Sequence, residues 1–241
     1  LVANGKNYCY RDLLNLSLET KKKIQELGIG EGNVVVILGD FSINSIAAMI
    51  SCFMVNATVV PVTEDAYMKL KQQLDLMKPD FFINTLFSSV SVSEYVSDLD
   101  GGDAWRALVP EAEPGLIVFT SGTTGTPKAI MHSVDALCYR YTDIKPALTC
   151  MCFLKFDHMG GFNTIFGMLF RGGTAVIPSR LDPESICSEI EKYKVNLLPS
   201  TPSFLTQLIM SNSIKLFDLG SLKVISYGTE VMSENYFVKA E

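Results

Sequence analysis

The chain has 241 residues, of which 48% are hydrophobic and 19% are charged, and its formal net charge is −6. This composition is that of a globular protein with a sizeable core, and it excludes a disordered tail. The negative charge argues against a nucleic-acid-binding protein, which needs a basic face to meet phosphates, although it does not exclude a locally positive site for a small anion.

Helical patterns alternate with short apolar runs along the chain. The first helical pattern covers 10–27 and stops at Gly28, and another covers 182–193, where Asp182 precedes Pro183 as a helix cap. The apolar runs expected to form strands are 34–38, 59–62, 81–83, 116–119, 174–177, 195–198 and 224–226. Continuous apolar runs are typical of strands that are covered on both faces. We therefore expect an α/β fold with mainly parallel sheets flanked by helices.

The chain is expected to form two packed sheet units. The stretch 88–103 is rich in Ser, Asp and Gly and is expected to link a unit of about 1–110 to a unit of about 111–241. Polar residues interrupt the apolar stretch 43–62, and Pro61 stands near its end, so a buried helix followed by a buried strand is expected there instead of a membrane span. No basic-then-apolar leader opens the chain, so no secretory signal is expected.

The cysteines and histidines do not have the spacing of a metal site. The six cysteines include no CxxC pair, and the only histidines are His132 and His158. We therefore expect no metal site built from these side chains. We interpret the cysteines as reduced, small apolar residues, which indicates a cytoplasmic compartment.

The polar loop that follows the run 116–119 is the most informative segment. The residues expected to contact phosphate are Thr120, Ser121, Gly122, Thr123, Thr124, Gly125, Thr126 and Lys128. Glycines allow backbone N–H groups to converge on an anion, hydroxyls bond phosphate oxygens, and a lysine supplies a compact positive charge. The pattern differs from GxxxxGK[ST] because Pro127 precedes the lysine and Ala129 follows it, which disfavours a P-loop kinase or GTPase. An ordinary solvated turn rarely gathers so many hydroxyls and glycines after a buried strand.

The segment 120–128 resembles the signature phosphate loop of the adenylate-forming superfamily, which comprises acyl-CoA synthetases, adenylation domains and luciferases. This resemblance implies that the loop grips the β- and γ-phosphates of ATP, which is bound with Mg²⁺, while a carboxylate attacks the α-phosphorus. It further implies transfer of the acyl group to coenzyme A or to the phosphopantetheine of a carrier protein. Ala129 stands where the family usually has glycine.

Two further segments are similar to family motifs in the same order. The segment 157–161 resembles the HxxG element, which begins a helix that lines the acyl pocket, and this implies pocket roles for His158, Gly160, Gly161 and Phe162. The segment 196–202 resembles the strand and turn that precede the next helix of these enzymes.

The segment 227–230 has two interpretations. It is similar to the family's YGxTE motif, whose glutamate helps to hold magnesium, but it lacks the residue between glycine and threonine. The approach through 218–225 is similar to that of an earlier element, whose backbone flanks the adenine. We therefore assign adenine binding to Gly228, Thr229 and Glu230.

The resemblance covers nearly the whole chain but not a whole enzyme. The family's magnesium-binding glutamate and catalytic lysine are expected beyond Glu241, so no catalytic residue is assigned, and the chain is expected to be an N-terminal fragment with little activity alone. The expected partners are a small carboxylic acid, ATP, and coenzyme A or an acyl carrier protein, with no nucleic acid and no membrane. The alternatives are a non-catalytic nucleotide-binding module and a luciferase-like oxidase that shares the adenylation step.

Overall fold

The structure, a computed structural model, describes residues 1–3, 5–87, 90–99, 103–110, 112–120, 126–143 and 145–228. The chain divides into two compact units. The loop unit, named for the polar loop whose flanking strands it contains, consists of 8–142 and 155–162. The terminal unit consists of 1–7, 143–154 and the described part of the chain from 163 onward.

This division differs from the boundary expected near residue 110, because strands on both sides of that position belong to one sheet. Strand β7 (Gly115–Thr120) pairs in parallel with β4 (Thr58–Val62), which keeps it in the loop unit. The stretch expected to be a linker also contains a strand, β6 (Ser91–Glu94), which pairs antiparallel with β5 (Phe81–Asn84). The unpaired backbone groups of an edge strand can bond to any short extended segment, whatever its side chains. The polar sequence of β6 therefore lacks the apolar pattern from which a strand is predicted.

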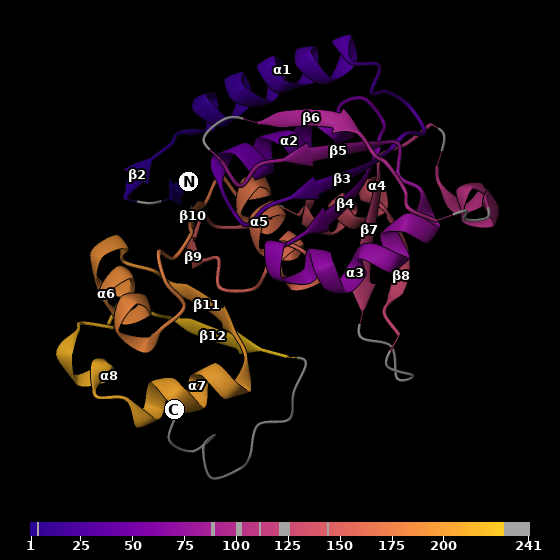
Figure 1. The fold of residues 1–241 in the computed structure, drawn as a ribbon. Coiled ribbons are helices and arrows are strands. Elements are labelled where there is room, and N and C mark those ends of the chain that lie inside the picture. The colour runs from indigo at the N-terminus through magenta and orange to yellow at the C-terminus, as the bar shows by residue number, and fades with distance from the viewer. Residues whose placement is uncertain are drawn as a thin grey trace. The chain divides into compact units, whose positions relative to one another are not determined.

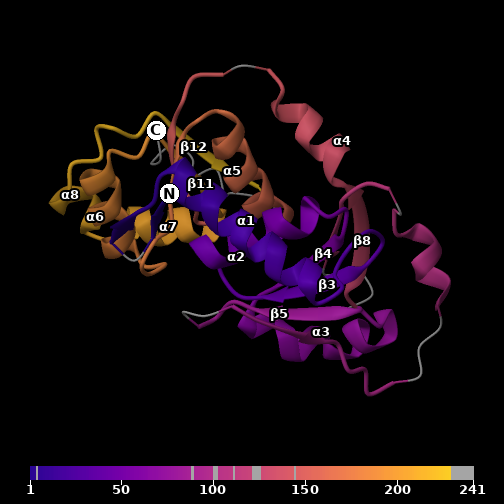
Figure 2. The same cartoon turned by 90° about the horizontal axis from the view of Figure 1, so that it is seen from above.

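The loop unit is a six-stranded sheet with the strand order β6-β5-β3-β4-β7-β8. Its further elements are α1 (Tyr10–Glu26), β3 (Val34–Leu38), α2 (Ile43–Phe53), α3 (Glu64–Met77), the 3₁₀ helix η1 (Asp103–Leu108), β8 (Lys128–Ser133), α4 (Val134–Cys138), the 3₁₀ helix η2 (Tyr139–Tyr141) and the first turn of α5 (Met159–Phe170). Helices α1 and α2 lie on one side of β3 and β4, and α3 lies on the other, in both views of the fold (Figures 1 and 2). Every residue of β3 and β4 is buried, which confirms the prediction of strands covered on both faces.

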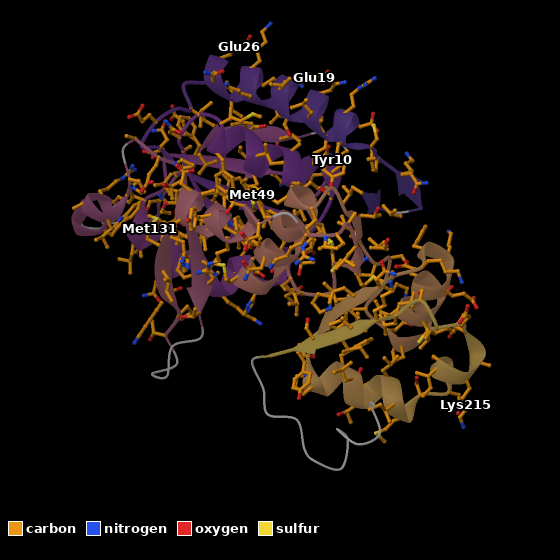
Figure 3. All side chains as sticks on the ribbon, turned by 180° about the vertical axis from the view of Figure 1, so that it is seen from behind. Tyr10, Glu19, Glu26, Met49, Met131 and Lys215 are labelled. Carbon is orange, nitrogen blue, oxygen red and sulfur yellow. The ribbon has the colours of Figure 1, made fainter. Side chains whose placement is uncertain are left out.

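Helix α1 shows how the sequence pattern sets the packing. Its buried residues are Leu13, Ser17, Thr20 and Ile24, which recur at helical spacing. The hydroxyl of Ser51 in α2 donates to the Ser17 carbonyl over 2.8 Å, so the two helices also share a buried hydrogen bond. Figure 3 shows Glu19 and Glu26 pointing away from the outer side of α1, whereas Met49 of α2 lies inside the unit.

The terminal unit is a second six-stranded sheet, with the order β12-β11-β9-β10-β1-β2. Its elements are β1 (Val2–Ala3), β2 (Lys6–Asn7), β9 (Thr149–Met151), the remainder of α5, β10 (Thr174–Val176), α6 (Pro183–Tyr193), β11 (Leu197–Ser200), α7 (Pro202–Met210), α8 (Ser213–Leu216) and β12 (Val224–Tyr227). All its described pairings are parallel except that of β1 with β2. The predicted cap of α6 is confirmed, because the Asp182 carboxylate accepts from the Ser185 N–H over 3.0 Å. The strand expected over 195–198 begins two residues later, at Leu197, and the Asn196 side chain before it bonds to Thr149 and Ser221.

Most of the cysteines are small buried side chains of the protein interior. No cysteine forms a disulfide, and Cys52, Cys150, Cys152 and Cys187 are buried, whereas Cys9 is exposed at the cap of α1. Burial raises the pKa of the Cys52 thiol to about 12, so this group is inert as a nucleophile. Among the described helices, none has the length and apolar character needed to cross a bilayer.

Candidate nucleotide-binding site

The two residues that flank the polar loop face each other across a hairpin. Strands β7 and β8 pair antiparallel from Gly115 opposite Ser133 to Thr120 opposite Lys128. Directly opposed residues of an antiparallel ladder project from the same face, so the Thr120 hydroxyl and the Lys128 ammonium leave the sheet together. Both residues are exposed, as is Thr126. The other predicted phosphate contacts, 121–125, lie outside the described residues.

This hairpin opens at an edge of the sheet where several parallel strands end. Strands β3, β5 and β7 all run parallel to β4 or to its neighbour, so their carboxyl ends share one edge. In open parallel sheets, this edge is where ligands bind. The strand ends are packed tightly there, because a Cβ added at Gly39 would lie 2.1 Å from the Thr85 hydroxyl oxygen.

The segment with the predicted acyl-pocket motif is attached to this same edge. Asp157 Oδ2 accepts from the Thr63 hydroxyl over 2.8 Å and from the Thr63 N–H over 3.4 Å. Thr63 directly follows β4 and is 2% exposed. It occupies the cap position of α3 but makes no side-chain capping bond, because its hydroxyl serves Asp157. The other oxygen, Asp157 Oδ1, is buried and has no hydrogen-bond partner within the described part of the chain.

The edge carries acidic groups at close range. Asp40 follows β3 in sequence, and burial and the nearby negative charge of Asp157 raise the pKa of its carboxyl. Lys155 opposes these charges, and its ammonium lies 3.8 Å from the Asp65 carboxylate. In the described ranges, no three side chains of His, Cys, Asp or Glu gather as they would around a metal ion.

Close packing fixes the start of helix α5. The Lys155 carbonyl accepts from the His158 N–H over 3.2 Å, and the His158 carbonyl accepts from the Phe162 N–H over 3.1 Å. The Phe162 ring is 3% exposed and meets Phe53 edge to face, with 6.5 Å between ring centroids. His158 is exposed, and Gly160 is half-buried. The structure therefore brings the four predicted pocket residues together at one helix start, and their contact with an acyl group stays a prediction.

Replacement of Gly161 by alanine is expected to lower both stability and activity. A Cβ at this position would lie 2.0 Å from the Lys155 carbonyl oxygen and 3.0 Å from Phe41 Cζ, so the backbone of the turn must move. Overpacking of this kind costs about 1–3 kcal/mol, which urea unfolding would measure. The matched control is Gly30→Ala, because a Cβ at Gly30 has open space around it and its φ is not in the left-handed region. Equal loss of stability in the two variants would contradict this account.

The predicted adenine site is described only at its first residue. Gly228 directly follows β12 and is exposed. Thr229 and Glu230 lie outside the described residues, so their assignment to adenine binding stays a prediction.

A separate hollow lies at the opposite edge of the loop unit. It has a volume of about 510 Å³ and is lined by Glu31, Gly32, Asn33, Arg106 and Val109. These residues precede β3 and β7, so the hollow lies at the amino ends of the strands and not at the phosphate loop. Its arginine is already engaged, since Arg106 pairs with both oxygens of Asp80 over 2.8 and 2.6 Å.

Sequence reasoning missed one residue that the structure brings into the site. Thr63 was not singled out, although it is the first polar residue after the apolar run 59–62. A polar residue at the carboxyl end of a buried parallel strand lies at the ligand-binding edge of the sheet. This position in the sequence is the signal that could have identified Thr63.

Two largely parallel sheets flanked by helices, with a hydroxyl-rich hairpin at a carboxyl edge, define an α/β protein of the adenylate-forming type. The model of the AMP-binding enzyme family matches residues 1–240, and the chain belongs to this family.

Relatives of this chain include ligases and peptide synthetases. It is 25% identical to a 4-coumarate–CoA ligase-like protein of Arabidopsis thaliana over 94% of this chain and 46% of that protein. It is 22% identical to bacitracin synthase 2 of Bacillus licheniformis over 92% of this chain and 9% of that protein. The chain therefore spans less than half the length of these relatives. The fold matches the inhibitor-bound N-terminal domain of FACL13 from Mycobacterium tuberculosis with a TM-score of 0.75 and 18% identity, over 95% of this chain and 65% of that one.

Proposed function

We propose that the chain is the phosphate-gripping and acyl-binding portion of an AMP-forming acid–thiol ligase. The observation that carries this proposal is the pairing of Thr120 with Lys128 at the mouth of the loop, in a chain of the AMP-binding enzyme family. The ligase and peptide synthetase relatives support an activity on carboxylic acids.

The proposed reaction has two steps. A carboxylate oxygen attacks the α-phosphorus of ATP, the bond from that phosphorus to the bridging oxygen breaks, and pyrophosphate leaves. A thiolate then attacks the acyl carbon and AMP leaves. Both steps depend on orientation and charge neutralisation more than on acid–base catalysis.

The residues of the loop unit have distinct roles in this scheme. The Lys128 ammonium and the hydroxyls of Thr120 and Thr126, with the loop residues 121–125, hold the β- and γ-phosphates. His158, Gly160, Gly161 and Phe162 form part of the acyl pocket, and Gly228 with Thr229 and Glu230 flanks the adenine. Mg²⁺ would accompany ATP and neutralise phosphate charge. The thiol acceptor is coenzyme A or the phosphopantetheine of a carrier protein, as the two kinds of relative suggest.

Pyrophosphate release by the intact gene product tests the proposal. We expect ATP-dependent release with at least one acid of a panel that contains 4-coumarate, hexanoate, palmitate and phenylalanine. A thiol-dependent second step would then appear as a thioester by mass spectrometry when coenzyme A or a phosphopantetheinylated carrier is added. Nucleotide binding without pyrophosphate release from any acid would instead identify a non-catalytic nucleotide-binding module.

We propose that the 241-residue chain alone catalyses this reaction weakly or not at all, because it spans 46% of the Arabidopsis relative. The expected result is ATP–pyrophosphate exchange at least about 100-fold below that of the intact gene product, which corresponds to the loss of about 2.7 kcal/mol of transition-state stabilisation. Robust exchange by the short chain would refute this expectation and leave the proposed reaction itself standing.

A further inference from the structure

We infer that Asp157 and Thr63 form a positioning pair that holds the turn 157–161, called here the acyl-binding turn, next to the phosphate loop. The inference rests on the proposed function, because it assigns the pair to placement of the carboxylic acid. Neither side chain is assigned to contact with ATP or with the acid.

The pair joins two segments that lie 94 residues apart in the sequence. The Thr63 hydroxyl and N–H both point to Asp157 Oδ2, and Thr63 is almost completely buried. A hydrogen bond to a charged acceptor in a buried place is stronger and more directional than one at the surface. The pair therefore fixes the backbone of the turn at Asp157 to the end of β4.

Position on the sheet connects this pair to the phosphate loop. Strand β4 is the neighbour of β7, and the two strands pair in parallel from Thr58 opposite Gly115. Because they start together and run the same way, they end at the same edge, β4 at Val62, directly before Thr63, and β7 at Thr120. The acyl-binding turn is thus held one strand away from the loop that grips the phosphates.

The turn is packed against aromatic rings, and the hydrogen-bond pair adds a polar anchor to this packing. The Phe156 ring is 2% exposed and meets Phe41 edge to face, with 5.5 Å between the ring centroids. Four charged groups act on Asp40 beside the turn: Asp157, Lys155, Asp65 and Glu64. This excess of negative charge would repel the Asp157 carboxylate from Asp40 if Asp157 were not hydrogen-bonded to Thr63. The two hydrogen bonds to Thr63 therefore oppose this repulsion and also order the turn.

The test compares Thr63→Val with Thr63→Ser in the intact gene product. Valine removes the hydroxyl donor and keeps the shape, and we expect kcat/KM for the best acid of the panel to fall by about 10–100-fold, because small misplacements of a reacting group have effects of this size. KM for ATP should change less than about 2-fold, since the loop on β7 is untouched. Serine retains the donor and should restore most of the rate.

The matched control is Ser51→Ala. Ser51 of α2 is also buried, and its hydroxyl donates to the Ser17 carbonyl of α1 over 2.8 Å, away from the carboxyl edge of the sheet. This variant loses an equivalent hydrogen bond without touching the turn, so its stability should fall as in Thr63→Val while its kcat/KM for the acid should not.

Hydrogen exchange supplies a readout that does not depend on activity. In Thr63→Val the amides of His158 and Phe162 should exchange about 10-fold faster than in Ser51→Ala. Unchanged exchange at these amides would overturn the positioning role, and so would equal losses for the acid and for ATP. If the unaltered protein forms no adenylate at all, the proposed function fails, and the exchange data still decide whether the pair anchors the turn.

Discussion

Replacement of Lys128 by alanine in the intact gene product is expected to lower the rate of acyl-adenylate formation by about 100–1,000-fold, the usual effect of removing one group that stabilises developing charge. Lys128 lies opposite Thr120 at the mouth of the loop and is the only charged side chain between residues 116 and 131. No neighbouring cation can replace it within that segment. The rate is measured as pyrophosphate release with saturating acid.

Two controls make this prediction specific. Lys22→Ala removes a lysine of α1 whose side chain is 80% exposed, and it should leave the rate unchanged. The unfolding midpoint of Lys128→Ala should match that of the unaltered protein, because the residue is exposed. An adenylation rate within about 2-fold of normal would show that Lys128 is not the phosphate ligand, since 2-fold corresponds to only about 0.4 kcal/mol.

The second large effect is expected at Asp75, a buried carboxylate of α3. Its side chain is 4% exposed and receives hydrogen bonds from the Lys71 ammonium and, over 2.8 Å, from the Tyr95 hydroxyl. Asp75→Ala removes the acceptor of the Tyr95 hydroxyl and leaves the Lys71 ammonium with Asp98 alone, and it is expected to lower the free energy of unfolding by about 2–3 kcal/mol, as measured by urea titration. The same Lys71 ammonium also lies 2.9 Å from Asp98, whose side chain is 75% exposed, so Asp98→Ala should cost less than about 1 kcal/mol.

The effect of Asp75 depends on pH in a defined direction. Burial alone would raise the pKa of this carboxyl, but the hydrogen bonds from Lys71 and Tyr95 outweigh burial and lower the pKa. A carboxyl with a lowered folded pKa contributes its stability above the unfolded value of about 4 and loses it as the pH falls through the folded value. The stability difference between Asp75→Ala and the unaltered protein should therefore shrink in acid. A difference that stays constant from pH 7 to pH 3 would contradict this assignment.

The sequence predicted the framework well because the framework depends on apolar periodicity. The runs at 34–38 and 59–62 correspond to strands β3 and β4, and the helix expected over 10–27 ends one residue short of that range. These elements are buried on a face or on both faces, so burial determines which residues they can contain.

The elements that the sequence did not predict depend on backbone pairing and on contacts between distant segments. β6 has a polar sequence and exists because β5 offers an open edge. The division of the chain differs from that expected because strand order is a property of the whole sheet and not of any one segment. In the same way, the residues next to Thr63 and Asp157 in the sequence do not predict the hydrogen bond between these two side chains.

Strand β1 has a consequence for how the protein is made. Val2 pairs in parallel with Val176, so β1 cannot form this pairing until the chain has been synthesised beyond residue 176. Until then, the side of β1 opposite β2 is an open strand edge that a chaperone or another nascent chain could occupy.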